Sequence, residues 1–179
     1  MGQTTCRVFI GLSLDGYIAD KGGGLDWLDR VPNPSGSDLG YAEFTSGIDA
    51  IVMGRNTFET VLGFGEWPYH LPVVVMSRSL ESIPNGLEDR AEISRQPPHD
   101  LIEDLSSRGL LNLYIDGGAV ISSFLDHNLI DEMTLSRLPV VLGGGVPLFG
   151  ELQEPHWLEH VATRSYPGGM VQSTYKRGT

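Results

Sequence analysis

A strand that runs through a glycine into a helix carries the clearest chemistry in this sequence. Residues 50–53 are apolar and predict a buried strand, which stops at Gly54 and leads into a helix. The first N–H groups of a helix have no partner within the helix, and with the helix dipole they favour an anion such as phosphate. Arg55 adds a permanent cation there, Thr57 adds a hydroxyl donor, and Asn56 lies between them.

The same pattern occurs again later in the chain. Residues 113–115 are rich in β-formers, and a helix-like segment from Ala119 follows Gly117 and Gly118. Two such helix starts in one small chain indicate a ligand with more than one phosphate, such as a dinucleotide. We therefore expect Gly117, Gly118 and Ala119 beside a diphosphate. The side chain of Asp116 should turn away from it, because a carboxylate repels an anion.

Length, charge and cysteine content narrow the class of protein. A chain of 179 residues predicts one domain, covering residues 1–179. The net charge of −11 argues against nucleic acid or an anionic membrane as the main partner. A single cysteine, Cys6, excludes a disulfide framework, and no apolar run approaches the roughly 20 residues of a membrane span. The polar N-terminus does not resemble a signal peptide, so we expect a soluble cytoplasmic protein.

The elements that position these residues alternate along the chain. Strands are predicted at 7–14, 50–53, 72–77, 91–93, 113–115 and 133–138, and helices at 26–30, 39–46, 56–62, 99–108 and 120–125. Residues 161–166 and 170–175 flank Pro167-Gly168-Gly169 and predict a hairpin. This alternation indicates an α/β fold whose sheet is mostly parallel, with an antiparallel C-terminal edge.

Several common site motifs are absent. The sequence has no P-loop, no Rossmann G-x-G-x-x-G after the first strand, and no G-x-S-x-G elbow. His156 and His160 have the spacing of a metal pair on a helix, but Pro155 precedes them and Glu159 is misplaced for a zinc protease motif. We therefore predict no metal site.

Several segments, in order along the chain, resemble one superfamily. Residues 53–59 are similar to the cofactor-binding segment of dihydrofolate reductases. Residues 13–16, 117–118, 129–132 and 139–149 resemble the reductase (C-terminal) domain of the riboflavin-biosynthesis bifunctional protein. The resemblance runs from Cys6 to about Phe149. It implies a dihydrofolate-reductase-like three-layer α/β/α fold, an NADPH-dependent reductase and a homodimer. One cysteine excludes the zinc deaminase domain of the bifunctional protein.

The resemblance also implies roles in holding NADPH. One group would grip the 2′-phosphate of the adenosine, and this group comprises Arg55, Ser77, Arg78 and Ser79. Another would line the nicotinamide, and it comprises Gly11, Leu12 and Ile18. Each arginine has a simpler interpretation as a solvated surface charge.

The residues expected on the substrate side are fewer. Asp26 is the candidate proton donor, and its alternative role is that of an acid stabilising a helix start. Trp27 could cover the substrate ring beside a glycine-rich loop, although a tryptophan is more often part of the core. Gly143 and Gly144 could wrap the substrate, or could simply form a wide connection after a strand.

The favoured function is NADPH-dependent reduction of a small pyrimidine- or pteridine-like compound in riboflavin biosynthesis. The specific case is 5-amino-6-(5-phosphoribosylamino)uracil, whose phosphate would need a basic cluster, for which Lys21, Arg30 and Arg137 are the candidates. One alternative is a dihydrofolate-reductase-like activity. Against it, residues 69–72 lack the arginine that folate enzymes place before the strand at 73–76. A non-catalytic NADP-binding protein is the other alternative.

Overall fold

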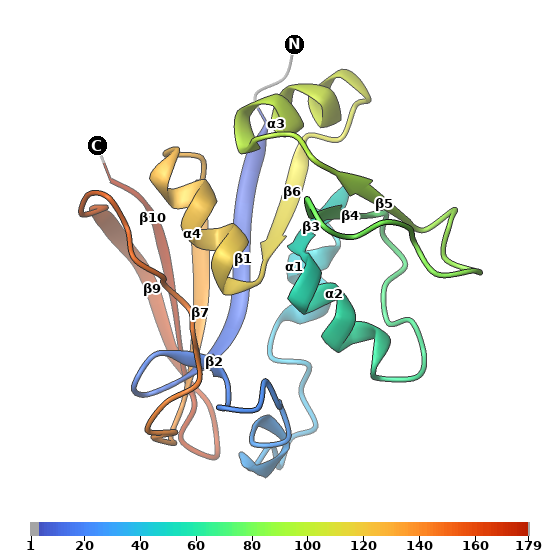
Figure 1. The fold of residues 1–179 in the computed structure, drawn as a ribbon. Coiled ribbons are helices and arrows are strands. Elements are labelled where there is room, and N and C mark those ends of the chain that lie inside the picture. Colours follow the sequence, from blue (N-terminus) through green and yellow to red (C-terminus); the bar gives the residue numbers. More distant parts are fainter. Residues whose placement is uncertain (1–3, 179) are drawn as a thin grey trace.

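An eight-stranded sheet forms the centre of the molecule in the computed structural model, which describes residues 4–178 (Figure 1). Its strand order is β5-β4-β3-β6-β1-β7-β10-β9. Neighbouring strands from β5 to β7 are parallel, and β10 and β9 are antiparallel to their neighbours. The strands are β1 (Thr5–Ser13), β3 (Ala50–Gly54), β4 (Val73–Met76), β5 (Ala91–Ser94), β6 (Asn112–Asp116), β7 (Glu132–Leu138), β9 (Leu158–Ser165) and β10 (Val171–Arg177).

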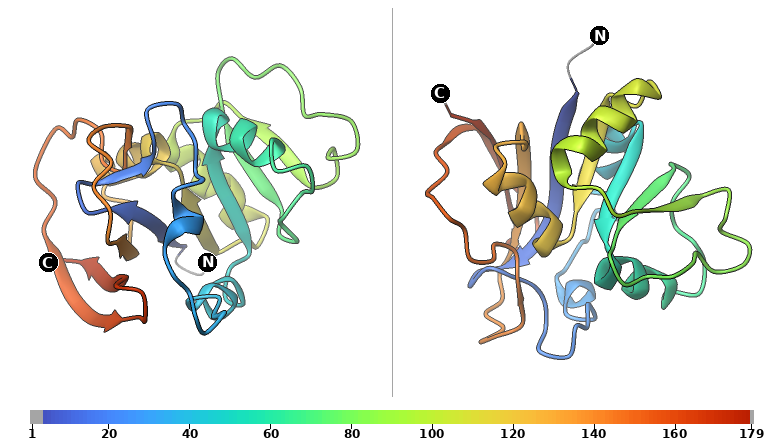
Figure 2. Two further views of the ribbon diagram at one scale, coloured as in Figure 1. Left: turned by 90° about the horizontal axis from the view of Figure 1, so that it is seen from below. Right: turned by 45° about the horizontal axis from the view of Figure 1, so that its top comes forward.

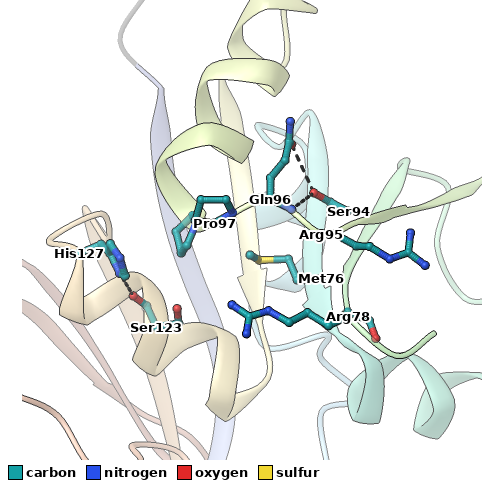
Figure 3. A pocket seen from close by; sticks show the side chains of 10 residues that line it. Met76, Arg78, Ser94, Arg95, Gln96, Pro97, Ser123 and His127 are labelled. Carbon is teal, nitrogen blue, oxygen red and sulfur yellow. Dashed lines mark hydrogen bonds between the residues drawn. The ribbon is translucent and has the colours of Figure 1, made fainter. Parts of the chain in front are cut away.

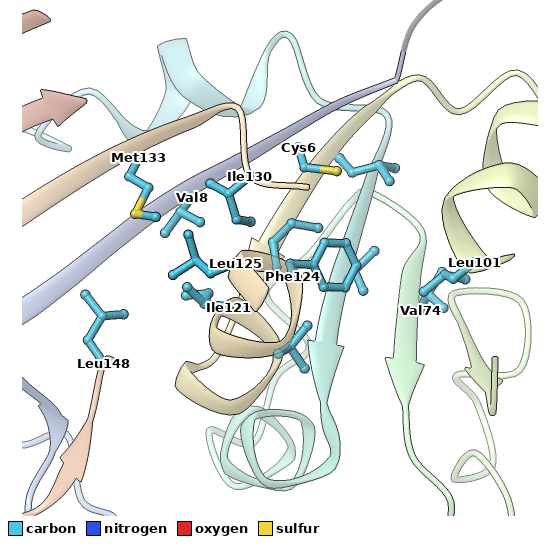
Figure 4. Close-up of a cluster of buried hydrophobic side chains, with 14 of the residues drawn as sticks. Cys6, Val8, Val74, Leu101, Ile121, Phe124, Leu125, Ile130, Met133 and Leu148 are labelled. Carbon is cyan, nitrogen blue, oxygen red and sulfur yellow. The ribbon is translucent and has the colours of Figure 1, made fainter. Parts of the chain in front are cut away.

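Helices cover both faces of this sheet. On one face, α3 (Pro98–Ser107) and α4 (Gly118–Asp126) bury Leu101 and Phe124 in the larger core cluster (Figure 4). On the other face, α1 (Tyr41–Thr45) and α2 (Arg55–Leu62) pack Phe44 and Phe58 against the opposite side of β3 and β4. Alternation along β3 explains the two layers, because Val52 faces the first cluster while its neighbours face the second.

The expected three-layer, mostly parallel α/β/α architecture with an antiparallel C-terminal hairpin is confirmed. Figure 2 shows the β9–β10 hairpin at one end of the sheet and β4–β5 at the other. A short 3-10 helix, η1 (Leu28–Arg30), occupies part of the segment expected to be helical at 26–30. In the described part of the chain, no helix has the length and apolar character needed to cross a membrane.

A second, two-stranded sheet was not expected. It pairs β2 (Tyr17–Ala19) with β8 (Val146–Pro147) in antiparallel fashion. Strands of three and two residues are too short to show an alternating pattern, so the sequence carries no signal for them. This small sheet lies close to the carboxyl end of β1, because β2 follows β1 after a tight turn in which the Gly16 N–H donates to the Ser13 carbonyl over 3.0 Å.

Candidate cofactor and substrate site

The two predicted strand-to-helix turns meet at the carboxyl edge of the sheet. β3 and β6 are adjacent and parallel, so α2 and α4 begin side by side. Both helix starts line one cavity of about 370 Å³, here called the helix-end cavity, which includes Gly54, Arg55, Asn56, Thr57, Gly117, Gly118 and Ala119. No side chain caps either helix start. Their first N–H groups are therefore free to bind an anion that enters this cavity.

Two glycines have no room for a side chain here. A Cβ atom on Gly117, whose φ is +90°, would lie 2.3 Å from Oγ1 of Thr57. A Cβ atom on Gly118 would lie 2.5 Å from the carbonyl oxygen of Pro147. Gly117 thus lets α2 and α4 approach each other, and Gly118 lets the β8 segment pack over the start of α4.

A cavity of about 350 Å³ adjoins the helix-end cavity and shares Met76 and Ser123 with it. We call it the arginine cavity, because Arg78 and Arg95 both contribute to its lining. In Figure 3, Arg78 extends below Met76 toward Ser123, whereas Arg95 extends in the opposite direction. The guanidinium of Arg95 donates to the Leu80 carbonyl over 3.0 Å. Arg78 is therefore the better placed of the two to meet a phosphate lying in the cavity.

A third cavity, of about 610 Å³ and here called the large cavity, also adjoins the helix-end cavity. The two share Ile18, Asn56, Thr57, Gly117 and Val146. Most of its other lining is apolar and comprises Ile10, Gly11, Ala19, Gly23, Leu25, Leu28, Val61 and Phe64, and its polar lining adds Glu59, Thr60, Tyr69 and Asp116. The three cavities form a row along the carboxyl edge of the sheet, the usual ligand position in open α/β folds.

Asp116 is one of the two acidic residues that line the large cavity, and Glu59 is the other. Burial raises its pKa to about 6, and the hydrogen bond from the Gly117 N–H to Oδ1, at 2.9 Å, opposes that shift. Burial and the nearby Asp116 carboxylate also raise the pKa of Tyr69. Asp116 does not line the helix-end cavity, which agrees with the expectation that it turns away from a phosphate. A carboxyl group with a pKa near neutrality beside an apolar cavity is suited to proton transfer.

The small β2–β8 sheet covers part of both cavities. Ile18 from β2 and Val146 from β8 line the large and the helix-end cavities. Asp15 fastens the loop before β8, because its two carboxylate oxygens accept the N–H groups of Leu142 and Gly143 at 3.0 and 2.8 Å. The hydrogen bond from Ser13 and these two amide bonds lower the pKa of Asp15 to about 2. Asp15 therefore remains charged and keeps its contacts throughout the neutral range.

Not every predicted residue reaches the three cavities. Asp26 is exposed and lines none of them, so the structure does not support it as the proton donor. Trp27 is 8% exposed and packs with Leu138 and Met170, which favours its role as a core residue. Leu12 is also buried in the core.

Four further positions differ in part from expectation. Gly143 and Gly144 lie in the loop held by Asp15 and line none of the three cavities. Arg55 lines the helix-end cavity instead of the arginine cavity, where Ser77 and Arg78 lie. The Arg55 guanidinium donates to Ser79 Oγ over 3.1 Å, so Ser79 orients that arginine and lines none of the cavities itself.

Sequence reasoning missed several lining residues. Arg95 and Gln96 follow β5, and their position beside β4 becomes evident only once those strands are known to be parallel neighbours. Tyr69 comes from an irregular loop and His127 from the end of α4, and neither has a local sequence signal.

The two histidines at metal spacing have different partners in the structure. His156 precedes β9 and lies 3.9 Å from an Asp126 carboxylate oxygen, whereas His160 is in β9 and its ring bonds to Thr163. Within residues 4–178, no three histidine, cysteine or carboxylate residues are grouped to hold a metal ion. His156 and His160 do not share a helix, so the i,i+4 spacing does not place the two rings one helical turn apart.

Two known proteins match nearly the whole chain. It is 32% identical over 173 residues to the uncharacterised protein YwjB of Bacillus subtilis, covering 95% of this chain and 96% of that protein. A Shewanella protein provisionally assigned to riboflavin biosynthesis has 45% identity and a TM-score of 0.95, covering 98% of this chain and all of that one.

More distant structures share the fold. RibD of Acinetobacter baumannii has a TM-score of 0.78 at 17% identity, and the match covers 99% of this chain and 59% of that protein. The model of the RibD C-terminal domain matches residues 4–171. The chain therefore belongs to the RibD C-terminal domain family.

Proposed function

We propose that this protein is an NADPH-dependent reductase of a small pyrimidine- or pteridine-like compound. The observation that carries the proposal is the pair of uncapped helix starts at one cavity, flanked by an arginine on one side and an apolar cavity on the other. A diphosphate fits the free N–H groups at the helix starts. An adenosine 2′-phosphate fits Arg78 in the arginine cavity, and a flat ring fits the apolar wall of the large cavity.

Particular residues of this chain would hold each part of the cofactor. Arg55 and the first N–H groups of α2 and α4 hold the diphosphate, and Arg78 holds the 2′-phosphate. Ile18 lines both the helix-end cavity and the large cavity, and Gly11 lines the large cavity. These two residues would fix the plane of the nicotinamide. When bound, NADPH supplies the hydride.

Asp116 replaces Asp26 as the candidate for moving the proton. Its pKa of about 6 leaves a fraction of the carboxyl groups protonated near neutral pH. Among residues 4–178, no hydrogen bond to Oδ2 of Asp116 is found, so that oxygen is available to a substrate atom in the large cavity. Tyr69 lines the same cavity and offers a hydroxyl group for orienting the ring.

Within this substrate class, 5-amino-6-(5-phosphoribosylamino)uracil is the first compound to test. A Thermotoga maritima protein of similar fold is named as its reductase, with 17% identity and a TM-score of 0.74, and this chain matches 57% of that protein. The Shewanella relative is assigned to riboflavin biosynthesis in general. Turnover of this compound would support the specific assignment. If the protein reduces other pyrimidines or pteridines but not this one, the proposal holds only for the wider class.

Cofactor titration tests the proposal itself. NADPH fluorescence should change on binding to the wild-type protein, and Arg78→Gln should weaken NADPH binding. A matched control is Arg90→Gln, because Arg90 is exposed and precedes β5 at the opposite end of that strand from the arginine cavity. If the wild-type protein binds neither NADPH nor NADH at millimolar concentration, the proposal is wrong.

A further inference from the structure

The large cavity has an unusual balance of charge for a site that would accept a phosphorylated substrate. Two acidic residues, Glu59 and Asp116, contribute to its lining. Among its described lining residues there is no lysine, arginine or histidine. A phosphate group in a protein site is normally held by cations or by several N–H donors, since its charge of nearly −2 is costly to desolvate.

The three basic residues expected from the sequence to bind a substrate phosphate do not supply this charge. Lys21, Arg30 and Arg137 are exposed and line none of the three cavities. The side chain of Lys21 lies against Gly144, where a Cβ atom would come within 2.6 Å of its Cε. Lys21 is therefore placed over the loop before β8 and outside the large cavity.

Arg55, which lines the adjoining helix-end cavity, already contacts other side chains. Nε of Arg55 lies 3.6 Å from Oε1 of Glu59, and its guanidinium also donates to Ser79. Arg55 lines the helix-end cavity, where the cofactor diphosphate would neutralise it. With the diphosphate bound, the charge facing the large cavity becomes more negative, and the chain's net charge of −11 adds to the repulsion of a further anion.

The walls of the large cavity favour a different kind of compound. Ile10, Ile18, Leu25, Leu28 and Val61 offer apolar surface against which a flat ring can pack. Asn56, Thr60, Tyr69 and Asp116 add hydrogen-bonding groups that suit the N–H and C=O groups of a heterocycle.

We infer that the substrate is a small heterocyclic compound without a phosphate or carboxylate group. This inference rests on the proposed function, because it takes the large cavity as the substrate site beside the nicotinamide. It excludes 5-amino-6-(5-phosphoribosylamino)uracil as the preferred substrate, and it equally excludes compounds with a glutamate tail. The charge of the substrate, more than the identity of its ring, is what the cavity selects.

A matched pair of ligands tests the inference. The probes are 5-amino-6-ribitylaminouracil and its 5′-phosphate, which share one ring and differ by the phosphate group. Each is titrated by calorimetry into the protein saturated with NADPH, after NADPH binding has been measured separately. We expect the unphosphorylated compound to bind at least about tenfold more tightly, and we expect the ratio to shrink as salt screens the repulsion.

Charge variants locate the effect in the cavity. Glu59→Gln should strengthen binding of the phosphorylated compound by about two- to fivefold, the size expected for one partly exposed charge. Glu103→Gln is the matched control, because Glu103 lies exposed on α3 and lines none of the three cavities. It should leave the ratio unchanged.

Equal or tighter binding of the phosphorylated compound would overturn the inference while leaving the proposed function intact. An identical effect of Glu59→Gln and Glu103→Gln would also overturn it, because the discrimination would then come from overall charge and not from the cavity. Failure of NADPH to bind in the first titration would count against the proposed function, so the two failures are distinguishable.

Discussion

Replacing Gly117 with alanine tests how the two helix starts are held together. The new Cβ atom would lie 2.3 Å from Oγ1 of Thr57 and 3.4 Å from its Cβ atom. Real contacts of this kind are not shorter than about 3 Å, so α2 or α4 must move or Thr57 must change rotamer. Alanine would also have to adopt φ +90°, a conformation that L residues rarely accept.

The two costs can be estimated separately. A strained backbone conformation costs about 1–3 kcal/mol, and overpacking in a tight site costs a similar amount. Gly117→Ala should therefore lower the free energy of unfolding by about 2–6 kcal/mol, a large share of the stability of an ordinary domain. It should also weaken NADPH binding, since both helix starts line the helix-end cavity.

Two further variants separate strain from collision. Gly16→Ala has nearly the same φ, +89°, but its Cβ atom would meet nothing within 4 Å, so it should show the strain alone. Thr57→Ala removes the colliding oxygen, and in the Gly117→Ala background it should restore at least about 1 kcal/mol. Urea unfolding gives the free energy of unfolding of the wild type, Gly117→Ala, Gly16→Ala and the Gly117→Ala, Thr57→Ala double variant. The reasoning fails if Gly117→Ala costs no more than Gly16→Ala, or if Thr57→Ala restores nothing.

The remaining predictions concern cofactor choice, pH, substrate and assembly. NADPH should bind more tightly than NADH, and Arg78→Gln should remove about 1–3 kcal/mol from NADPH binding while sparing NADH; equal affinities of the wild type for both cofactors would contradict this. Turnover should fall as pH rises through about 6, because Asp116 is protonated below that value, and a profile flat from pH 5 to 8 would rule out its role as proton donor. The same raised pKa means that the free energy of unfolding declines as pH rises from about 4 to 6, because Asp116 loses its proton at lower pH in the unfolded state than in the folded state. Asp116→Asn should abolish this decline in urea titrations. Dihydrofolate should be a poor substrate, and a rate above about 1 s⁻¹ at micromolar KM would show otherwise. Light scattering should give twice the chain mass of 19.5 kDa, because the edge strand β9 and the 82% exposed Trp157 leave surface for a second copy. A monomeric mass at micromolar concentration would exclude a dimer.

The helix starts could be predicted from the sequence because their signals are local. Gly54 and Gly117 each end an apolar run and begin a helix, and the chemistry of a helix start depends on nothing distant. Each turn is therefore visible in the residues around it. That they share one cavity depends on β3 and β6 being neighbours, although nearly sixty residues separate them.

The structure differs from the sequence-based expectation where the site depends on parts of the chain that are distant in sequence. Asp26 is the proton donor expected from the sequence, but its segment folds with an exposed carboxylate beside a buried Trp27. Asp116 is the last residue of β6, and its burial becomes evident only when β3 and β1 are placed on either side of that strand. Tyr69 enters the same cavity from a loop whose path no periodic pattern records.

The attachment of the β8 segment by Asp15 has a kinetic consequence. Val146 touches both the cavity assigned to the cofactor and the cavity assigned to the substrate, and the segment is held by the carboxylate of Asp15 and by the Leu148 N–H bond to the Gly16 carbonyl, at 2.9 Å. A cofactor and a substrate that both lie beneath the β8 segment would not exchange independently, because movement of this segment exposes both of them. If the proposed ligands leave only when this segment detaches, the rate of detachment sets an upper limit on turnover that no change to the reacting groups can raise.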